Sequence, residues 1–163
     1  MSGGYLVRAA TDSDVEAIVG YEIDIAVVSF AEEAITDPKL HRKRVTGALG
    51  KPGEIMLVAV AERAPEIPVG WAWLSARTNS LTGDRYGNFR SLATSDVPDR
   101  SQIGELLMAA VVAAAEEAGL TQLTGKVNAR NVGMRTLYRK FGFEATHLTM
   151  ERKAGQDHAG RGD

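Results

Sequence analysis

The sequence contains no cysteine, and this absence excludes two classes of small protein. Without cysteine among its 163 residues, the chain can form neither a disulfide framework nor a cysteine-based metal site. The three histidines show no metal-ligand spacing, so we expect no metal. A chain without disulfides suits a reducing compartment, and we therefore predict a cytoplasmic protein.

An excess of charge of one sign and a long hydrophobic run are also missing. A net charge of -2 creates no field that would recruit nucleic acid or an anionic membrane, and His41 to Arg44 ("HRKR") suit the solvated face of a short helix. The N-terminus has no basic stretch followed by an apolar core, so no signal peptide is expected. The apolar run Val111 to Ala115 is short and flanked by glutamates, which favours a buried helix over a membrane span. We predict no nucleic-acid partner and no membrane partner.

What remains is the composition of one globular domain. Hydrophobic residues make up 44% of the chain and charged residues 25%, the range of a soluble domain with a core. We assign residues 1–153 to this domain. The tail 154–163 ("AGQDHAGRGD") has almost nothing to bury and is predicted to be disordered.

The hydrophobic pattern changes between strand and helix periods along the chain. Strands are predicted over 5–11, 55–63, 69–77, 89–97, 120–127 and 143–153, with turns at 64–68 and 79–88. Helices are predicted from a Thr11 cap to Phe30, from Asp37 to Leu49, from Ile103 to Ala118 and around Met134 to Phe141. The order is β-α-α-β-β-β-α-β-α-β, an α/β fold with one mixed sheet of about six strands flanked by helices.

Two motifs within residues 92–143 carry a family resemblance. Asn131 is followed seven residues later by Tyr138, which Leu137 precedes, and then by Gly142-Phe143. Upstream, Gly104 lies in the first turn of a helix and is followed by Leu107 and Met108. Together with the element order, this resembles the GNAT superfamily of acetyl-CoA-dependent N-acetyltransferases. The resemblance implies transfer of an acetyl group from acetyl-CoA to an amine of a small molecule or peptide.

The resemblance also implies a set of cofactor-binding residues. The backbone of Leu92 and Thr94 would contact acetyl-CoA, and Asn131 would hold its pantetheine arm. The pyrophosphate would bind at Arg100, Ser101, Gln102, Ile103 and Gly104. This loop departs from the family pattern, since Asp99 is acidic where Gln or Arg is usual and Gln102 stands where a glycine lets the backbone approach the phosphates.

Tyr138 is the residue that the resemblance makes catalytic, as the acid that protonates the departing CoA sulfur. From its position on the apolar side of a helix, Tyr138 is equally a core tyrosine, and Asn131 is equally a helix cap. No general base is assigned, because Glu22, Glu32, Glu33, Asp96 and a water chain all remain open.

Two alternatives differ from the enzyme in class. One is a non-catalytic acyl-CoA-binding or regulatory domain of the same fold, which the irregular loop at 99–104 favours. The other is an interaction domain with no CoA site. The acceptor has no recognisable motif, and a homodimer is an expectation from the resemblance alone.

Overall fold

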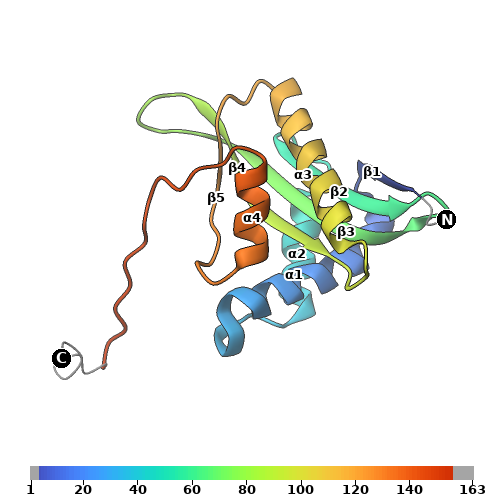
Figure 1. Ribbon diagram of the computed structural model, residues 1–163, viewed down its shortest axis with the longest axis horizontal. Coiled ribbons are helices and arrows are strands. Elements are labelled where there is room, and N and C mark those ends of the chain that lie inside the picture. The colour runs from blue at the N-terminus through green and yellow to red at the C-terminus, as the bar shows by residue number, and fades with distance from the viewer. Residues whose placement is uncertain (1–3, 156–163) are drawn as a thin grey trace.

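The computed structural model describes residues 4–155, and its centre is a single five-stranded sheet. The strands lie side by side in chain order: β1 (Tyr5–Ala9), β2 (Glu54–Ala61), β3 (Ala64–Thr78), β4 (Arg85–Thr94) and β5 (Leu123–Gly125) (Figure 1). The pairs β1–β2, β2–β3 and β3–β4 are antiparallel, whereas β5 runs parallel to β4. This confirms the predicted mixed α/β fold.

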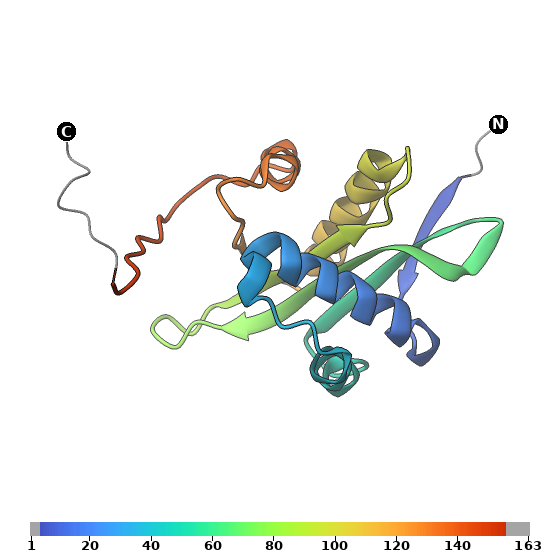
Figure 2. The ribbon, with the colours of Figure 1, turned by 90° about the horizontal axis from the view of Figure 1, so that it is seen from below.

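Helices cover both faces of the sheet. α1 (Val15–Phe30) and α2 (Pro38–Ala48) pack on one face, where Trp71 and Trp73 of β3 are fully buried. α3 (Arg100–Glu117) and α4 (Val132–Lys140) lie on the opposite face (Figure 2). Within residues 4–155, no helix is long and apolar enough to cross a membrane.

Short-range signals in the sequence explain where the helices begin and end. The Thr11 N–H donates to Asp14 Oδ2 over 2.8 Å in a 3₁₀ turn (Asp12–Asp14) that precedes α1. Asp37 caps α2 by accepting from the Lys39 N–H, and Pro38 takes the first helical position. After α3, Gly119 adopts a φ of 79°, the left-handed conformation that glycine favours at a helix C-terminus.

Two predicted turns are wrong in extent. Residues 64–68 ("APEIP") belong to β3, and the chain reverses just before them. Pro68 is tolerated there because the β2–β3 register shifts at this point and β4 pairs with β3 only from Gly70 onward. Similarly, β4 begins at Arg85, inside the predicted turn 79–88.

The predicted closing strand over 143–153 is also wrong, so the sheet has five strands rather than about six. Residues 144–153 form no strand, and this segment leads away from the body of the molecule (Figure 1). In a strand, alternate residues face the same side. The apolar residues here are odd-numbered up to Ala145 and even-numbered from Leu148, so no single strand face would be apolar. Leu148 and Met150 are accordingly exposed. Of the predicted tail, residues 156–163 lie outside the described part.

Candidate functional site

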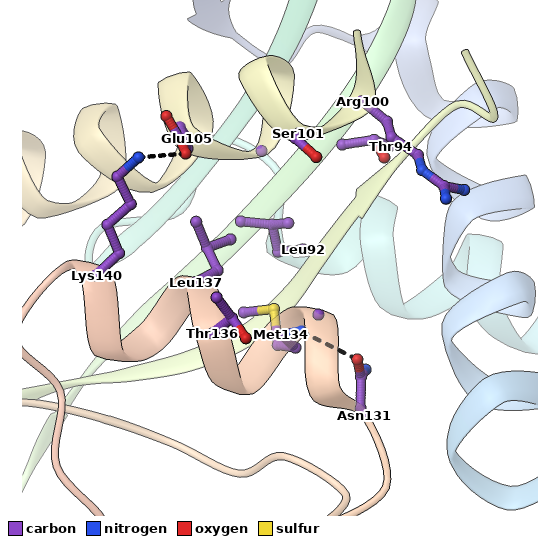
Figure 3. Close-up of a pocket in the computed structure, with 12 residues that line it drawn as sticks. Leu92, Thr94, Arg100, Ser101, Glu105, Asn131, Met134, Thr136, Leu137 and Lys140 are labelled. Atoms are coloured by element: carbon purple, nitrogen blue, oxygen red, sulfur yellow. Dashed lines mark hydrogen bonds and ion pairs between the residues drawn. The ribbon is translucent and has the colours of Figure 1, made fainter. Parts of the chain in front are cut away.

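A cleft of roughly 320 Å³ lies between the edge of β4 and the helices α3 and α4 (Figure 3). Three elements that are distant in sequence therefore meet in one concave site. The residues that line it are Leu92, Thr94, Arg100, Ser101, Gly104, Glu105, Asn131, Gly133, Met134, Thr136, Leu137 and Lys140.

The cleft exists because β4 is longer than the strand beside it. The β4–β5 ladder holds three residue pairs and ends at Phe89 and Gly125. β4 continues to Thr94, so Leu92 and Thr94 lie on a stretch of β4 that has no strand on its β5 side among residues 4–155. Backbone groups on such a stretch are available to a ligand.

The start of α3 forms the second wall. α3 begins at Arg100, one turn before the predicted first residue Ile103, so the predicted loop at 99–104 is the first turn of a helix. The first intrahelical bond runs from the Ile103 N–H to the Asp99 carbonyl over 3.0 Å. The N–H groups of Ser101 and Gln102 therefore have no acceptor within the helix, and the helix dipole adds partial positive charge there.

Gly104 leaves room next to this helix start. A Cβ placed on Gly104 would meet only Leu137 Cδ2, at 3.8 Å. A Cβ would therefore be accommodated there, and a longer side chain would extend toward Leu137 and the cleft. Gly104 thus leaves space between α3 and α4. Its position in the first turn of a helix had suggested such a role.

Asp99, the acidic departure from the family pattern, is directed elsewhere. Its Oδ2 accepts a hydrogen bond of 2.7 Å from the Tyr5 hydroxyl on β1, and this bond raises the pKa of Tyr5. Asp99 is not among the residues that line the cleft. Its carboxylate is therefore held toward the far strand of the sheet rather than toward a ligand at Arg100 and Ser101.

Two predicted cofactor-binding residues lie outside the cleft lining. Gln102 is exposed on α3, so its bulk does not fill the site. Ile103 is fully buried in the core, and its N–H already bonds to Asp99. The structure brings together the other six, namely Leu92, Thr94, Arg100, Ser101, Gly104 and Asn131.

α4 supplies the third wall. The Asn131 side chain accepts a 3.0 Å hydrogen bond from the Met134 N–H, so Asn131 caps α4 and lines the cleft at once (Figure 3). Gly133, Leu137 and Lys140 share one helix face by their spacing. Sequence reasoning missed Lys140 and its ion pair with Glu105, although the i, i+3 spacing from Leu137 was a usable signal.

Tyr138 faces the neighbouring side of α4 and is not a lining residue. Its ring packs against Phe89 and Phe143, with centroids 5.9 and 4.8 Å away, and only 8% of it is exposed. Its hydroxyl lies against Gly125, which leaves no space there for a Cβ. Tyr138 thus lies where β4 and β5 part, and burial raises the pKa of Tyr138 to about 12.

The candidate bases occupy different environments. Glu22 of α1 is 4% exposed and accepts a 2.8 Å hydrogen bond from Ser91 Oγ of β4. Glu32, Glu33 and Asp96 are exposed. Among residues 4–155, no group of three or more acidic, histidine or cysteine side chains is arranged to hold a metal ion.

Comparison with known proteins agrees with this geometry. Residues 24–143 match the Acetyltransferase (GNAT) family. This match spans more than half of the chain, and the chain therefore belongs to the GNAT acetyltransferase family. No curated protein sequence matches the chain.

Solved structures share the fold at low sequence identity. A transcriptional regulator from Bacillus halodurans C-125 superposes with a TM-score of 0.76 at 17% identity, covering 92% of this chain and 99% of that one. A predicted acetyltransferase from Clostridium acetobutylicum, solved with acetyl-CoA, gives 0.72 at 17% identity, covering 92% and 96%. The aminoglycoside antibiotic 6'-N-acetyltransferase AAC(6')-Ih from Acinetobacter baumannii gives 0.70 at 13% identity, covering 94% and 100%. At these identities the likeness establishes the fold alone.

Proposed function

We propose that this protein transfers an acetyl group from acetyl-CoA to an amine of a small molecule or peptide. The observation that carries the proposal is the space at Gly104, which lies beside the unpaired N–H groups of Ser101 and Gln102. A diphosphate needs both close backbone approach and N–H donors, and the start of α3 offers the two together.

The residues fit acetyl-CoA as a co-substrate. Ser101 and Gln102 would donate backbone N–H groups to the pyrophosphate. Arg100, which pairs with the exposed Asp96 over 3.2 Å, would turn to the phosphates and add positive charge. The edge of β4 at Leu92 and Thr94 would bind the pantetheine arm opposite Asn131. The thioester supplies the acetyl group and a thiolate leaving group.

The chain's own residues then have two tasks. Free backbone N–H groups on β4 would orient and polarise the acetyl carbonyl, which places an attacking amine and stabilises developing negative charge. Tyr138 would donate its hydroxyl proton to the thiolate as it leaves. Its pKa of about 12 keeps the hydroxyl protonated throughout the neutral range, as an acid must be before the reaction.

Calorimetric titration with acetyl-CoA tests the site, with Gly104→Leu as the blocking variant. The added side chain should occupy the cleft and weaken acetyl-CoA binding about 10-fold or more, and a thermal unfolding scan checks that the variant is folded. Gly20→Leu is the matched control, since Gly20 is a helical glycine of α1 with nothing within 4 Å. Equal affinity in both variants would place the coenzyme elsewhere.

A non-catalytic acyl-CoA-binding domain is the second candidate. One observation favours it: Tyr138, the proposed acid, does not line the cleft, and its hydroxyl lies against Gly125. Binding of acetyl-CoA without acetylation of any member of a broad amine panel would support this binder. Turnover of one amine would eliminate it.

A further inference from the structure

A second polar cluster lies on the sheet face opposite the cleft, under α1 and α2. It contains three arginines and two buried or nearly buried glutamates: Arg44, Arg77, Arg90, Glu22 and Glu54. Four of the five are matched in pairs. Arg44 Nη2 is 3.6 Å from Glu22 Oε1, and Arg77 Nη1 is 3.7 Å from Glu54 Oε1. Arg90 is the remaining charge.

The glutamates are also occupied by neutral donors. Glu22 accepts from Ser91 Oγ, and Glu54 accepts from Trp73 Nε1 over 2.8 Å and from Ser75 Oγ. Arg44 Nη2 also donates to His41 Nδ1, and His41 Nε2 donates to the Ile35 carbonyl. The cluster therefore keeps one surplus positive charge, located on Arg90.

A β-bulge in β4 turns the Arg90 side chain toward the sheet face that α1 and α2 cover. Trp73 pairs with Ser91, and the next residue, Leu74, pairs with Phe89, so Arg90 is the extra residue of β4. Arg90 and Ser91 are consecutive yet both face α1 and α2, since Ser91 bonds to Glu22 and Arg90 lies over Trp73. Regular strand alternation would have turned one of them away.

The guanidinium of Arg90 is held in place but has no partner. Its Cζ is 3.8 Å from the centroid of the fully buried Trp73 ring, a stacking contact that fixes the plane of the group. Within residues 4–155, it makes no hydrogen bond and no ion pair. Partial burial lowers the pKa of Arg90, the charge of Glu54 opposes this shift, and the like charges of Arg44 and Arg77 add to it.

Arg90 also lies beside the point where a transferred acetyl group would arrive. It follows Phe89, the last residue of β4 that pairs with β5, and Phe89 packs against Tyr138. The cleft, whose β4 lining starts at Leu92, lies on one face of the sheet, and Arg90, two residues earlier in β4, lies on the other. A molecule held by Arg90 would reach the gap between β4 and β5 from the side opposite the coenzyme.

Building on the proposed function, we propose that the acceptor amine carries a carboxylate and that Arg90 binds this group. A planar, pre-oriented guanidinium with free donors matches a carboxylate in a bidentate arrangement. The acceptor class is therefore an amino acid or a peptide with an acidic group near its reacting amine.

Product binding tests the proposal without requiring turnover. N-acetyl amino acids and their carboxamides, which differ only in the carboxylate, are titrated calorimetrically with and without CoA into the wild-type chain, Arg90→Gln, Arg90→Lys and Arg85→Gln. Arg85 is an exposed arginine of the same strand and serves as the control. Acetylated tripeptides and their amides form a parallel series that separates peptide acceptors from free amino acids.

The wild type should bind acids about 10- to 100-fold more tightly than the matching amides, the range of one charge-assisted contact. Arg90→Gln should abolish that difference, Arg90→Lys should keep part of it, and Arg85→Gln should keep all of it. Equal binding of acid and amide by the wild type, or a preference that persists in Arg90→Gln, would overturn the proposal. So would a failure of every carboxylate to bind. Loss of CoA binding alone would instead contradict the proposed function, because the titrations without CoA report on Arg90 independently.

Discussion

Asp14 shows how one residue ties the first strand to the first helix. Its side chain is fully buried, yet it is charged, because Arg8 Nη1 and Nη2 donate to its two oxygens over 2.7 and 2.9 Å. The Thr11 N–H adds a third bond. These donors, Arg8 foremost, lower the pKa of Asp14 below its ordinary 3.8.

Asp14→Asn should lower the free energy of unfolding by about 2 to 3 kcal/mol at neutral pH, since hydrogen bonds to charged groups are lost. The folded pKa lies below the unfolded one, so this stabilisation is present above about pH 4 and is lost as the pH falls through the folded value. Urea unfolding should therefore show a smaller difference in the free energy of unfolding between wild type and variant near pH 3 than at pH 7. Asp12→Asn, exposed in the same turn, should change little. A difference in the free energy of unfolding that does not change with pH would contradict the lowered pKa of Asp14.

Tyr138→Phe tests the proposed acid, also at the scale of one residue. Loss of the hydroxyl should reduce kcat about 100-fold and leave acetyl-CoA affinity nearly unchanged, because Tyr138 does not line the cleft. Steady-state rates and calorimetry on the same preparation separate the two effects. Tyr86→Phe, on β4, provides the control. Wild-type kcat in Tyr138→Phe would leave Tyr138 as a core tyrosine that fills the space beside Gly125.

At the scale of elements, the contact between α3 and β3 determines where the cleft wall stands. A Cβ on Gly70 would come within 2.8 Å of Leu107 Cδ1 and 2.9 Å of Ile103 Cγ2. The helix can lie this close to the sheet only because Gly70 has no side chain. The position of Arg100, Ser101 and Gly104 therefore depends on a glycine of a different element.

Gly70→Ala should destabilise the fold by about 1 to 3 kcal/mol through overpacking. Gly47→Ala is the matched control, because Gly47 lies in α2 with nothing within 4 Å and alanine should stabilise that helix by up to about 1 kcal/mol. Thermal or denaturant unfolding measures both. Equal stability of the two variants would mean that α3 packs less closely than described.

At the scale of the whole molecule, the sheet separates the cleft proposed for the coenzyme from the face proposed for the acceptor. The cleft lies under α3 and α4, and Arg90 lies under α1 and α2. Two substrates that approach from opposite faces can be bound together. The sequence also has no cysteine to carry the acetyl group as an enzyme thioester.

Initial-rate measurements with both substrates varied should therefore give intersecting double-reciprocal lines, the pattern of a ternary complex. The two substrates to vary are acetyl-CoA and an acceptor amine that carries a carboxylate. Parallel lines, together with an isolable acetylated protein, would indicate a covalent intermediate and contradict simultaneous binding across the sheet.

Much of this organisation was predictable from local sequence. Asn131, Leu137 and Gly104 indicated the family, and short-range signals such as Asp37-Pro38 placed helix starts, because capping depends on neighbours in sequence. The hydrophobic pattern wrongly predicted a strand over residues 143–153, because a strand forms only where another strand offers an edge to pair with. It also placed the start of α3 too late, because a polar first turn carries no apolar period.

The sequence by itself determined the family, the order of elements as far as the last helix and six residues of one cleft, since these follow from motifs and periodicity along the chain. Only the tertiary structure decided that Asp99 is drawn to Tyr5, that Gln102 faces solvent and that Arg90 lies unpaired over Trp73. Each of these depends on a partner in another strand or on one extra residue in a ladder. Strand pairing and side-chain direction are set by contacts across the sheet, which are distant in sequence.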